Sequence, residues 1–490
     1  MKETYAGIDL GTSAVKLLLM DADGKILKTV SKDYPISFPK PGWSEQNPED
    51  WYRQSVAGLK ELLAGEDAKL CGISFGGQMH GLVALDAADN VIRPAILWND
   101  GRTEKECVYL NSTVGRDIVS AETGNIAFAG FTAPKLLWMK ENEPELFGKI
   151  AKIMLPKDYL IYRFSGVHAT DVSDASGMLL FDVKNRSWSK KMCELCSVED
   201  SWLAKICESY EVVGELKPAL ADELGVGAGV KVIAGAGDNA AAAVGTGTVH
   251  NGDCNISLGT SGTVFISSDN YSVDSKNALH SFAHANGRYH LMGCMLSAAS
   301  CNQWWMGDIL KDKDFAAAQA GITKLGENAV YFLPYLMGER SPHNDPHARG
   351  AFIGMRMDTS REDMVQAVFE GVAFGLRDSF EVAKSSGLDI KRTKICGGGA
   401  KSPIWRKIMA NVLGISVDTI ESEEGPALGG AMLAAVGCGR FASVEAAADA
   451  IVRVTGTVEP EEALVKKYEE RYAMFRELYP ALKPSFAKMD

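Results

Sequence analysis

Residues 7–20 read GIDLGTSAVKLLLM, and residues 255–268 read NISLGTSGTVFISS. The shared Leu-Gly-Thr-Ser begins at Leu10 and again at Leu258, 248 positions apart in a chain of 490 residues. In each copy a short apolar run, a Gly-Thr-Ser turn and a second apolar run predict a β-hairpin. Similarity at an offset close to half the chain length indicates duplicated architecture.

Alternating helix and strand signals follow each hairpin. In the first half, Asn47 and Pro48 open a helical pattern with acidic residues in its first turn, which is typical of a capped helix. In the second half, residues 360–387 predict a long helix, and residues 393–420 predict strand, glycine loop, helix and strand. We therefore expect an α/β fold with two domains, 1–246 and 247–490, flanking a cleft. The sequence leaves open whether the helix from about residue 461 packs on its own domain or returns to the first.

The composition excludes several classes of protein. The formal net charge is −12, whereas proteins that bind nucleic acids gather basic residues, so we expect no nucleic-acid partner. No apolar run reaches the ~18 residues of a membrane span, and the first residues lack the apolar run of a signal peptide. The ten cysteines follow no disulfide or zinc pattern. A cytoplasmic protein with no membrane partner is expected.

The two Gly-Thr-Ser turns have the chemistry of phosphate sites. Gly11, Thr12 and Ser13, like Gly259, Thr260 and Ser261, offer backbone N–H groups and hydroxyls with little side-chain bulk. Two such hairpins facing each other across a cleft would hold the phosphates of one nucleotide. The first copy has Asp9 where the second has Ser257. One carboxylate among phosphates indicates Mg²⁺, held directly or through water.

Residues 231–245, KVIAGAGDNAAAAVG, combine an apolar strand, a glycine turn and a helix start around one carboxylate, Asp238. Gly235 and Gly237 fit a dinucleotide-binding turn, and Asp253, 18 residues beyond Gly235, stands near the position of a ribose-binding acid. The alternative is a rigid turn that holds the carboxylate of Asp238 in a fixed position. A fixed anion in the turn would repel pyrophosphate, so we favour this second interpretation.

At this point the sequence resembles a known family, the FGGY carbohydrate kinases of the actin, hexokinase and Hsp70 ATPase superfamily. The resemblance runs from about Gly7 to Gly439 through GIDLGTS, SLGTSG, GAGDNAAAAVG, YLMGERSP (335–342) and GGGAKSPIWRKIMANVLG (397–414). It implies a ribonuclease-H-like fold in both domains and phosphorylation of a sugar by ATP with Mg²⁺. GWSEQNPEDW (42–51), GGQMHG (76–81), ILWNDGR (96–102) and LPKDYLIYRFSG (155–166) are similar to family members that phosphorylate D-xylulose. A homodimer is a further expectation from the resemblance.

The resemblance also implies roles for individual residues. Asp238 would be the general base, and Asp9 the carboxylate associated with Mg²⁺. Predicted sugar contacts are Gln78, Met79, His80, Trp98, Asp100, Arg102 and Asn239. Predicted ATP contacts are the two Gly-Thr-Ser turns, 11–13 and 259–261, together with Gly398, Gly399, Ala400 and Ser402.

Chemistry supports the role of Asp238, since a sugar hydroxyl is a poor nucleophile and a positioned carboxylate can accept its proton. Some residues keep a second interpretation. His80 could be a buried structural histidine, and Arg102 could pair with Asp100 on the surface. Glu339 and Arg340 could either stabilise a loop or contact ligand. We expect Trp304 and Trp305 to pack in the core, and a hinge near Gly245–Gly247 to close the cleft.

Three alternative functions remain at this stage. The first is a kinase of the same family that acts on another ketose or polyol, such as L-xylulose, ribulose or glycerol. The second is an ATPase of the superfamily without sugar kinase activity. The third is the nicotinamide enzyme that the dinucleotide-like turn would indicate.

Overall fold

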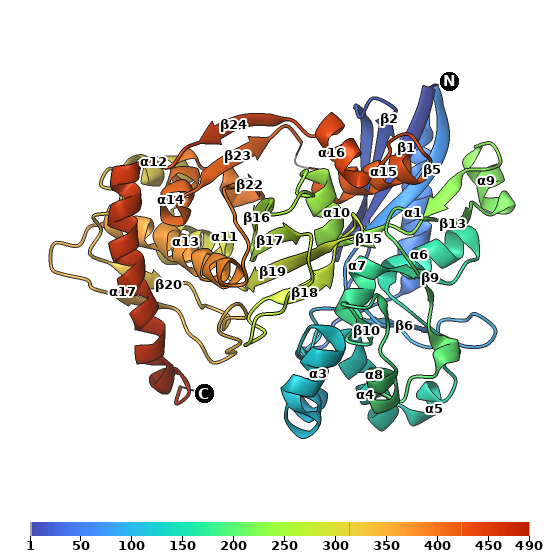
Figure 1. The fold of residues 1–490 in the computed structure, drawn as a ribbon, viewed down its shortest axis with the longest axis horizontal. Helices are drawn as coiled ribbons and strands as arrows, with labels where there is room; N and C mark the ends of the chain where they lie inside the picture. Colours follow the sequence, from blue (N-terminus) through green and yellow to red (C-terminus); the bar gives the residue numbers. More distant parts are fainter. Residues whose placement is uncertain (1, 313, 423, 490) are drawn as a thin grey trace.

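Two large β-sheets organise the protein (Figure 1). The computed structural model describes residues 2–312, 314–422 and 424–489. Within these residues the first seven-stranded sheet contains β13 (Val212–Glu215), β14 (Lys231–Ile233), β5 (Ala68–Gly77), β1 (Lys2–Leu10), β2 (Ala14–Asp21) and β3 (Ile26–Asp33) in that order, with β15 (Ala236–Gly237) also paired to β5. The second has the order β18 (His280–Ala283), β19 (Tyr289–Met295), β17 (Gly262–Ser268), β16 (Cys254–Leu258), β22 (Arg392–Cys396), β23 (Ser416–Ile420) and β24 (Val454–Val458).

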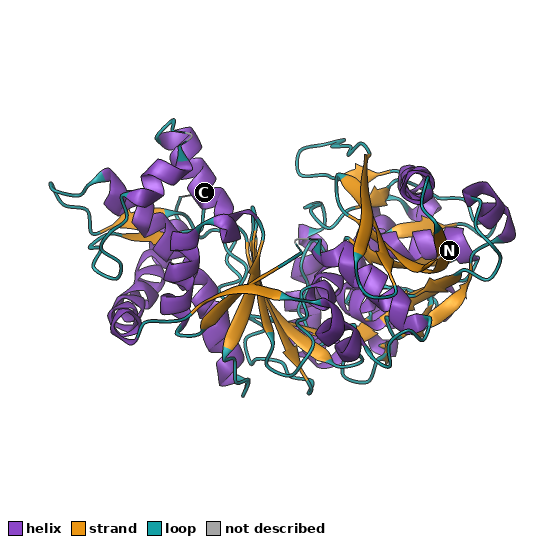
Figure 2. Cartoon of the chain, turned by 90° about the horizontal axis from the view of Figure 1, so that it is seen from above, coloured by secondary structure: helices purple, strands orange, loops and turns teal. Residues whose placement is uncertain are grey.

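The duplicated hairpins predicted from the sequence are confirmed. β1 and β2 pair antiparallel with Asp9 opposite Lys16, and β16 and β17 pair antiparallel with Ser257 opposite Thr263. Each hairpin also has a parallel neighbour on its first strand, β5 beside β1 and β22 beside β16. Both halves of the chain therefore repeat one arrangement, and Figure 2 shows the two sheets in separate lobes with helices around them.

Helices and short ladders cover the sheets. The helices are α1 (Pro48–Leu63), α2 (Glu104–Val108), α3 (Arg116–Thr123), α4 (Thr132–Asn142), α5 (Pro144–Phe147), α6 (Pro156–Ser165), α7 (Val172–Ala175), α8 (Lys190–Leu195), α9 (Pro218–Leu224), α10 (Asp238–Gly245), α11 (Ala299–Gln303), α12 (Phe315–Ala320), α13 (Arg361–Ser385), α14 (Pro403–Leu413), α15 (Gly425–Gly437), α16 (Val444–Ile451) and α17 (Glu462–Phe486). Two-stranded ladders join β4 (Glu45–Gln46) to β7 (Ala95–Ile96), β6 (Val83–Leu85) to β8 (Lys152–Met154), β9 (Ala169–Asp171) to β12 (Lys205–Cys207), β10 (Phe181–Asp182) to β11 (Ser187–Trp188), and β20 (Tyr331–Leu333) to β21 (Ala351–Ile353).

The predicted helix starts are confirmed by their capping bonds. Asn47 accepts a hydrogen bond from the N–H of Glu49 at the start of α1. Ser360 and Asp363 form a capping box at the start of α13, so two of the unpaired N–H groups of that helix are satisfied. Trp304 and Trp305 pack against the core of the second lobe, as expected.

The C-terminal helix α17 packs on the second lobe. Its buried aromatic residues Tyr468, Tyr472, Phe475 and Tyr479 belong to the core that also contains α13 and α14. This settles the question that the sequence left open.

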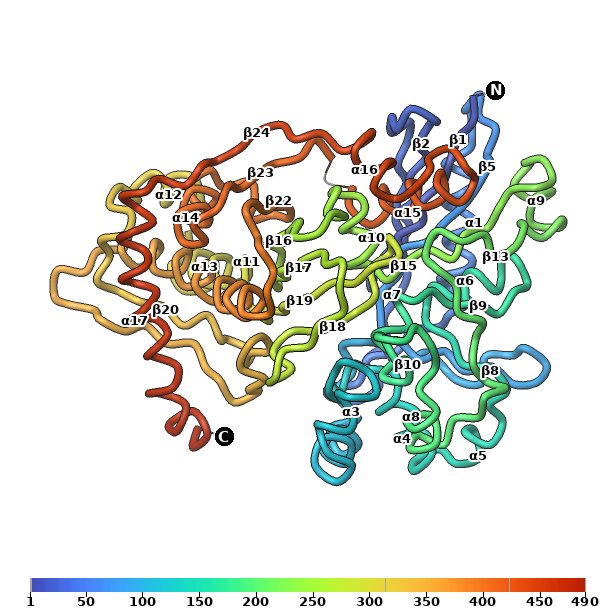
Figure 3. The backbone as a smooth tube through the Cα atoms, in the orientation of Figure 1, coloured from blue at the N-terminus to red at the C-terminus, as the bar shows by residue number. Residues whose placement is uncertain are grey.

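A different segment returns to the first lobe. Helices α15 and α16 lie against the first sheet, where Leu428 and Ala431 of α15 share a core with Tyr5, Leu18 and Met20 (Figure 3). The sequence division places residues 425–451 in the second domain, but their side chains pack with the first sheet and with α10.

Glycines allow this return because α15 lies in direct backbone contact with its neighbours. A Cβ atom on Gly7 of β1 would come 1.9 Å from the carbonyl oxygen of Ala427. A Cβ on Gly245 would come 2.0 Å from the oxygen of Gly425, and one on Gly429 would come 1.9 Å from the oxygen of Ala241. Only glycine fits at these three crossings.

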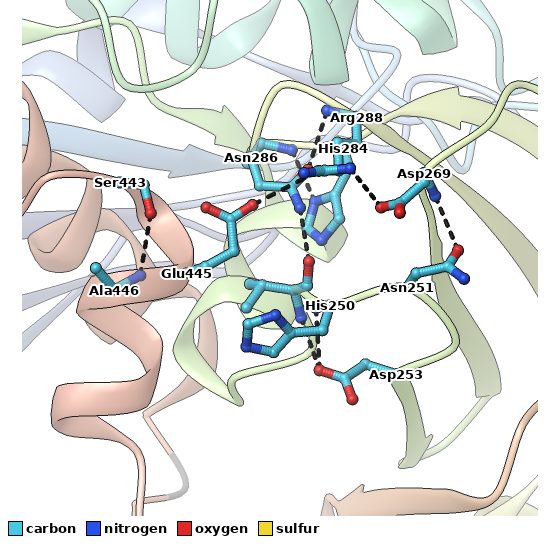
Figure 4. A network of polar contacts seen from close by, with 12 residues as sticks. His250, Asn251, Asp253, Asp269, His284, Asn286, Arg288, Ser443, Glu445 and Ala446 are labelled. Carbon is cyan, nitrogen blue, oxygen red and sulfur yellow. Dashed lines mark hydrogen bonds and ion pairs between the residues drawn. The ribbon is translucent and has the colours of Figure 1, made fainter.

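Polar contacts fix the connection between the two halves (Figure 4). The N–H groups of Val249 and His250 donate to one carboxylate oxygen of Asp253, and the side chain of Asn286 donates to the oxygen of Val249. Arg288 pairs with Asp269 at 2.6 Å and reaches Glu445 of α16 at 3.8 Å. These contacts connect the loop after α10, the second sheet and α16.

Among the residues that the structure describes, no helix is long and apolar enough to cross a membrane.

We expect Gly429→Ala to lower the free energy of unfolding by about 2 kcal/mol or more, because the added methyl group would overlap the backbone of α10. Gly307→Ala is the matched control, since a Cβ there meets nothing within 4 Å. The control should leave stability unchanged or slightly raised. Thermal and urea unfolding of both variants measure this, and equal stabilities would contradict the packing described for α15.

Candidate active site

The predicted site residues meet where parallel strands of the first sheet end. Asp9 of β1 lies beside Gly76 of β5, and Gly237 of β15 lies beside Gly77. The carboxyl ends of these strands lead into the Gln78–His80 loop and into Asp238, so the three segments reach the same edge of the sheet. Such an edge is the usual position of a ligand site in an α/β fold.

Asp238 is the first residue of α10, and only one of its two carboxylate oxygens is hydrogen-bonded to the described protein residues. The N–H and the side-chain Nδ2 of Asn239 both donate to its Oδ1, at 2.7 and 2.9 Å. In the described part of the chain its Oδ2 has no protein hydrogen-bond partner. Burial raises the pKa of Asp238 from 3.8 to about 6, against the opposing effect of the bonds from Asn239. The group can therefore take up a proton near neutral pH.

Asp9 is a second perturbed carboxyl in the same place. Burial, followed by the negative charge of Asp238, raises the pKa of Asp9 to about 7, while the charge of Lys16 opposes the rise. Lys16 stands opposite Asp9 in the hairpin register and forms an ion pair with Glu424 at 2.9 Å. Neither Lys16 nor Glu424 is among the site residues predicted from the sequence. The register of the predicted hairpin could have identified Lys16, but Glu424 comes from the other half of the chain.

His80 presents one ring nitrogen as an acceptor. Its Nδ1 lies 2.9 Å from the carbonyl oxygen of Gly177, which can only accept, so Nδ1 carries the hydrogen. Burial lowers the pKa of His80 to about 3, so the ring is neutral and Nε2 is unprotonated. The ring stacks on Phe131 with centroids 4.5 Å apart. A Cβ on Gly177 would come 2.3 Å from Nδ1, so this approach requires glycine.

The backbone around His80 is also held firmly. His80 has a positive φ of 70°, and its carbonyl oxygen accepts from the buried ammonium of Lys135 at 2.8 Å and from Thr132 at 3.0 Å. Met79 is buried beside it, and a Cβ on Gly237 would come 2.9 Å from the Cγ of Met79. The Gln78–His80 loop and the segment that carries Asp238 therefore touch each other.

Gln78 and Trp98 connect this loop to the first Gly-Thr-Ser turn. Gln78 is buried, and its Nε2 donates to the oxygens of Gly11 and Gln46, at 3.2 and 3.1 Å. Trp98 is 42% exposed, and its indole N–H donates to the hydroxyl of Thr12 at 2.9 Å. Trp98 stays available for a ligand contact, whereas the Nε2 of Gln78 is occupied by the protein.

Asp100 and Arg102 form an ion pair, as the sequence allows, but the pair is buried and does not lie at the surface. Their side chains are only 0% and 1% exposed. Arg102 donates to both oxygens of Asp100, and the N–H of Ser44 also donates to Asp100. Arg102 further pairs with Glu45 at 2.8 Å. Because these partners occupy the carboxylate of Asp100, the pair stabilises the loop after Trp98, and a sugar contact of either residue stays a prediction.

A pocket of about 280 Å³ joins the two lobes beside Asp238. It is lined by Asp238, Asn239, Ala242, Thr246, Asn255, Ser257, Thr263, Phe265, Cys396, Gly397, Ser422, Gly425 and Pro426. The pocket therefore brings the candidate base together with strand residues of the second hairpin and the start of the glycine loop after β22, next to the predicted nucleotide contacts but without including them.

The remaining nucleotide candidates differ in their surroundings. Thr260 and Ser261 are exposed at the tip of the second hairpin. Gly398, beside Ala400 in the turn before α14, has open space where a side chain would be, so a ligand can approach it. Gly399 is buried against Leu258. Ser402 caps α14 by accepting from Trp405 and donates to Gln319, so its hydroxyl is occupied by the protein.

The fold and this site define a two-lobed α/β protein with a buried carboxylate, Asp238, in a pocket between the lobes. Models of the FGGY family of carbohydrate kinases match residues 4–245 (N-terminal domain) and 254–438 (C-terminal domain). The chain belongs to this family, whose members use ATP and a sugar as substrates.

Individual relatives agree with the family. The xylulose kinase of Escherichia coli (strain K12) is 40% identical over 490 residues, covering 99% of this chain and 100% of the relative. A crystal structure described as a xyloylose kinase from Brucella ovis has a TM-score of 0.94, 39% identity, and coverage of 98% and 99%. A gluconate kinase structure from Lactobacillus acidophilus has a TM-score of 0.95 and 26% identity, covering both chains completely.

Proposed function

We propose that this protein transfers the γ-phosphoryl group of ATP to D-xylulose to form D-xylulose 5-phosphate. The observation that carries the proposal is Asp238, a buried carboxylate with one oxygen fixed by Asn239, inside a pocket shared with the second Gly-Thr-Ser hairpin. Support for the substrate comes from the relatives named xylulose kinase and from the Gln78–His80 loop that the sequence associates with them.

Asp238 acts as the general base. Its Oδ2 accepts the proton of the sugar hydroxyl as the oxygen attacks phosphorus, and its Oδ1 stays bonded to Asn239. A pKa of about 6 suits this task, because the group is ionised at neutral pH and still basic enough to take the proton.

Asp9 holds Mg²⁺. Among the residues that the structure describes, no cation forms an ion pair with Asp9, since Lys16 is paired with Glu424, and a buried carboxylate of this kind fits Mg²⁺. The metal would neutralise charge on the phosphoryl oxygens when bound. The two hairpin turns, 11–13 and 259–261, bind the phosphates with their N–H groups and hydroxyls, and the open face of Gly398 receives the adenosine.

The sugar binds in the first lobe. His80 offers Nε2 as an acceptor for a sugar hydroxyl, because its Nδ1–H is committed to Gly177. Met79 supplies an apolar contact, and Asn239 lies beside the reacting hydroxyl. Closure of the lobes about the 245–247 segment, a homodimer and a cytoplasmic location remain predictions from the sequence.

The substrate is tested by measuring ADP release with Mg²⁺·ATP and a panel of D-xylulose, L-xylulose, ribulose, glycerol and gluconate, with a no-sugar control. D-xylulose should give the highest kcat/KM, and Asp238→Asn should lower kcat by about 100- to 10,000-fold, which is the typical contribution of a general base. Preference for another sugar would overturn the substrate, and turnover that needs no sugar would favour an ATPase.

The pH dependence of kcat/KM should show two carboxyl groups. Asp238 must be deprotonated to act, and its pKa is raised to about 6, so kcat/KM falls as the pH drops through 6. Asp9, with a pKa of about 7, should add a loss below pH 7 that saturating Mg²⁺ moves to lower pH, because the metal binds the ionised form. A profile that stays flat to pH 5 would contradict the assignment of Asp238.

A further inference from the structure

A buried ionic cluster lies directly behind the site and has no role in the mechanism above. The ammonium group of Lys157 contacts Asp158 at 2.6 Å, Asp171 at 2.9 Å and Asp174 at 3.6 Å, and all four side chains are at most 1% exposed. Lys157 packs under the last residue of β5, since a Cβ on Gly77 would come 2.7 Å from its Cβ. Burying one cation with three carboxyl groups is costly.

One chain of bonds leads from this cluster to the catalytic segment. The Oδ2 of Asp171 accepts the hydroxyl hydrogen of Ser173 at 2.5 Å. The hydroxyl oxygen of Ser173 in turn accepts the N–H of Gly237 at 3.1 Å. Because a serine hydroxyl has a single hydrogen, its bond to Asp171 turns the oxygen lone pairs toward Gly237.

The peptide group of Gly237 affects the positions of both Asp238 and Met79. Gly237 is the residue before Asp238 and caps the N-terminus of α10, so a shift of its peptide group displaces the carboxyl of Asp238. Gly237 also borders Met79 and pairs with Gly77 across the strands. Its position therefore sets both the base and one wall of the sugar site.

Asp171 does not depend on this one bond. Its Oδ2 also accepts from the N–H of Ser173 at 2.8 Å and from the hydroxyl of Ser209 at 2.6 Å, while Lys157 contacts its Oδ1. Removing the hydroxyl of Ser173 leaves Asp171 with four donors, the N–H of Asp174 included, but takes away the acceptor of the Gly237 N–H. The hydroxyl therefore has more consequence for Gly237 than for the cluster.

We propose that Ser173, oriented by Asp171 and Lys157, is a positioning residue that holds the Gly237 peptide and thereby aims Asp238 at the sugar hydroxyl. It touches neither substrate. This inference rests on the proposed function, in which Asp238 is the base. A displacement of about 1 Å at a reacting group can reduce a rate about 100-fold, so loss of this bond should affect the chemical step more than binding.

The test compares Ser173→Ala with Ser209→Ala in the full-length enzyme. Both remove a buried hydroxyl that donates to the same oxygen of Asp171, but only Ser173 contacts Gly237. We expect Ser173→Ala to lower the single-turnover phosphoryl-transfer rate about 10- to 100-fold, with the KM values for D-xylulose and ATP within about threefold of wild type. Ser209→Ala should retain the wild-type rate within about threefold.

Equal losses in the two variants would assign the effect to general stability and would overturn the proposal, as would a wild-type rate in Ser173→Ala. If Ser173→Ala does not fold, Ser173→Cys replaces it, because sulfur keeps the shape and accepts weakly, and the same loss is expected. Asp238→Asn, measured in parallel, distinguishes failure of the base assignment from failure of the positioning role. An active Asp238→Asn enzyme overturns the base and the positioning role together, whereas an inactive one with a fully active Ser173→Ala overturns the positioning role alone.

Discussion

The close contact between α10 and α15 is the constraint on which the site depends. α10 comes from the first half of the chain and α15 from the second, and glycines at 245 and 429 allow their backbones to touch. Both helices begin at the interlobe pocket, with Asp238 and Asn239 at the start of α10 and Gly425 and Pro426 at the start of α15. Helix N-termini carry partial positive charge, so the packing that joins the two halves also brings two such ends to the pocket.

The second determinant is the burial of two carboxyl groups, Asp9 and Asp238, at neighbouring strand ends. Burial raises the pKa of each, and the charge of Asp238 raises that of Asp9 further. Such an arrangement destabilises the protein, but it leaves one carboxyl basic enough to accept a proton near neutral pH. A cation bound beside Asp9 would relieve the repulsion between the two carboxylates, whereas an anion would add to it.

The sequence predicts the parts of this structure that depend on local patterns. Repeated strand and turn signals identify both hairpins, and the glycine-flanked segments locate Asp9, His80 and Asp238. Local sequence patterns do not predict the packing between segments that are far apart in the chain. Nothing local shows that α15 returns to the first sheet, that Glu424 reaches Lys16, or that the Asp100–Arg102 pair is buried under Trp43. Ser402 matches a nucleotide motif, but its hydroxyl caps a helix.

The most direct measurement is a crystal structure of the enzyme with D-xylulose, Mg²⁺ and a non-hydrolysable ATP analogue. The account predicts the C5 hydroxyl of the sugar within about 3 Å of the Asp238 carboxylate, with the γ-phosphate between the turns at 11–13 and 259–261. A sugar hydroxyl bonded to a different base, or phosphates bound away from both turns, would contradict it.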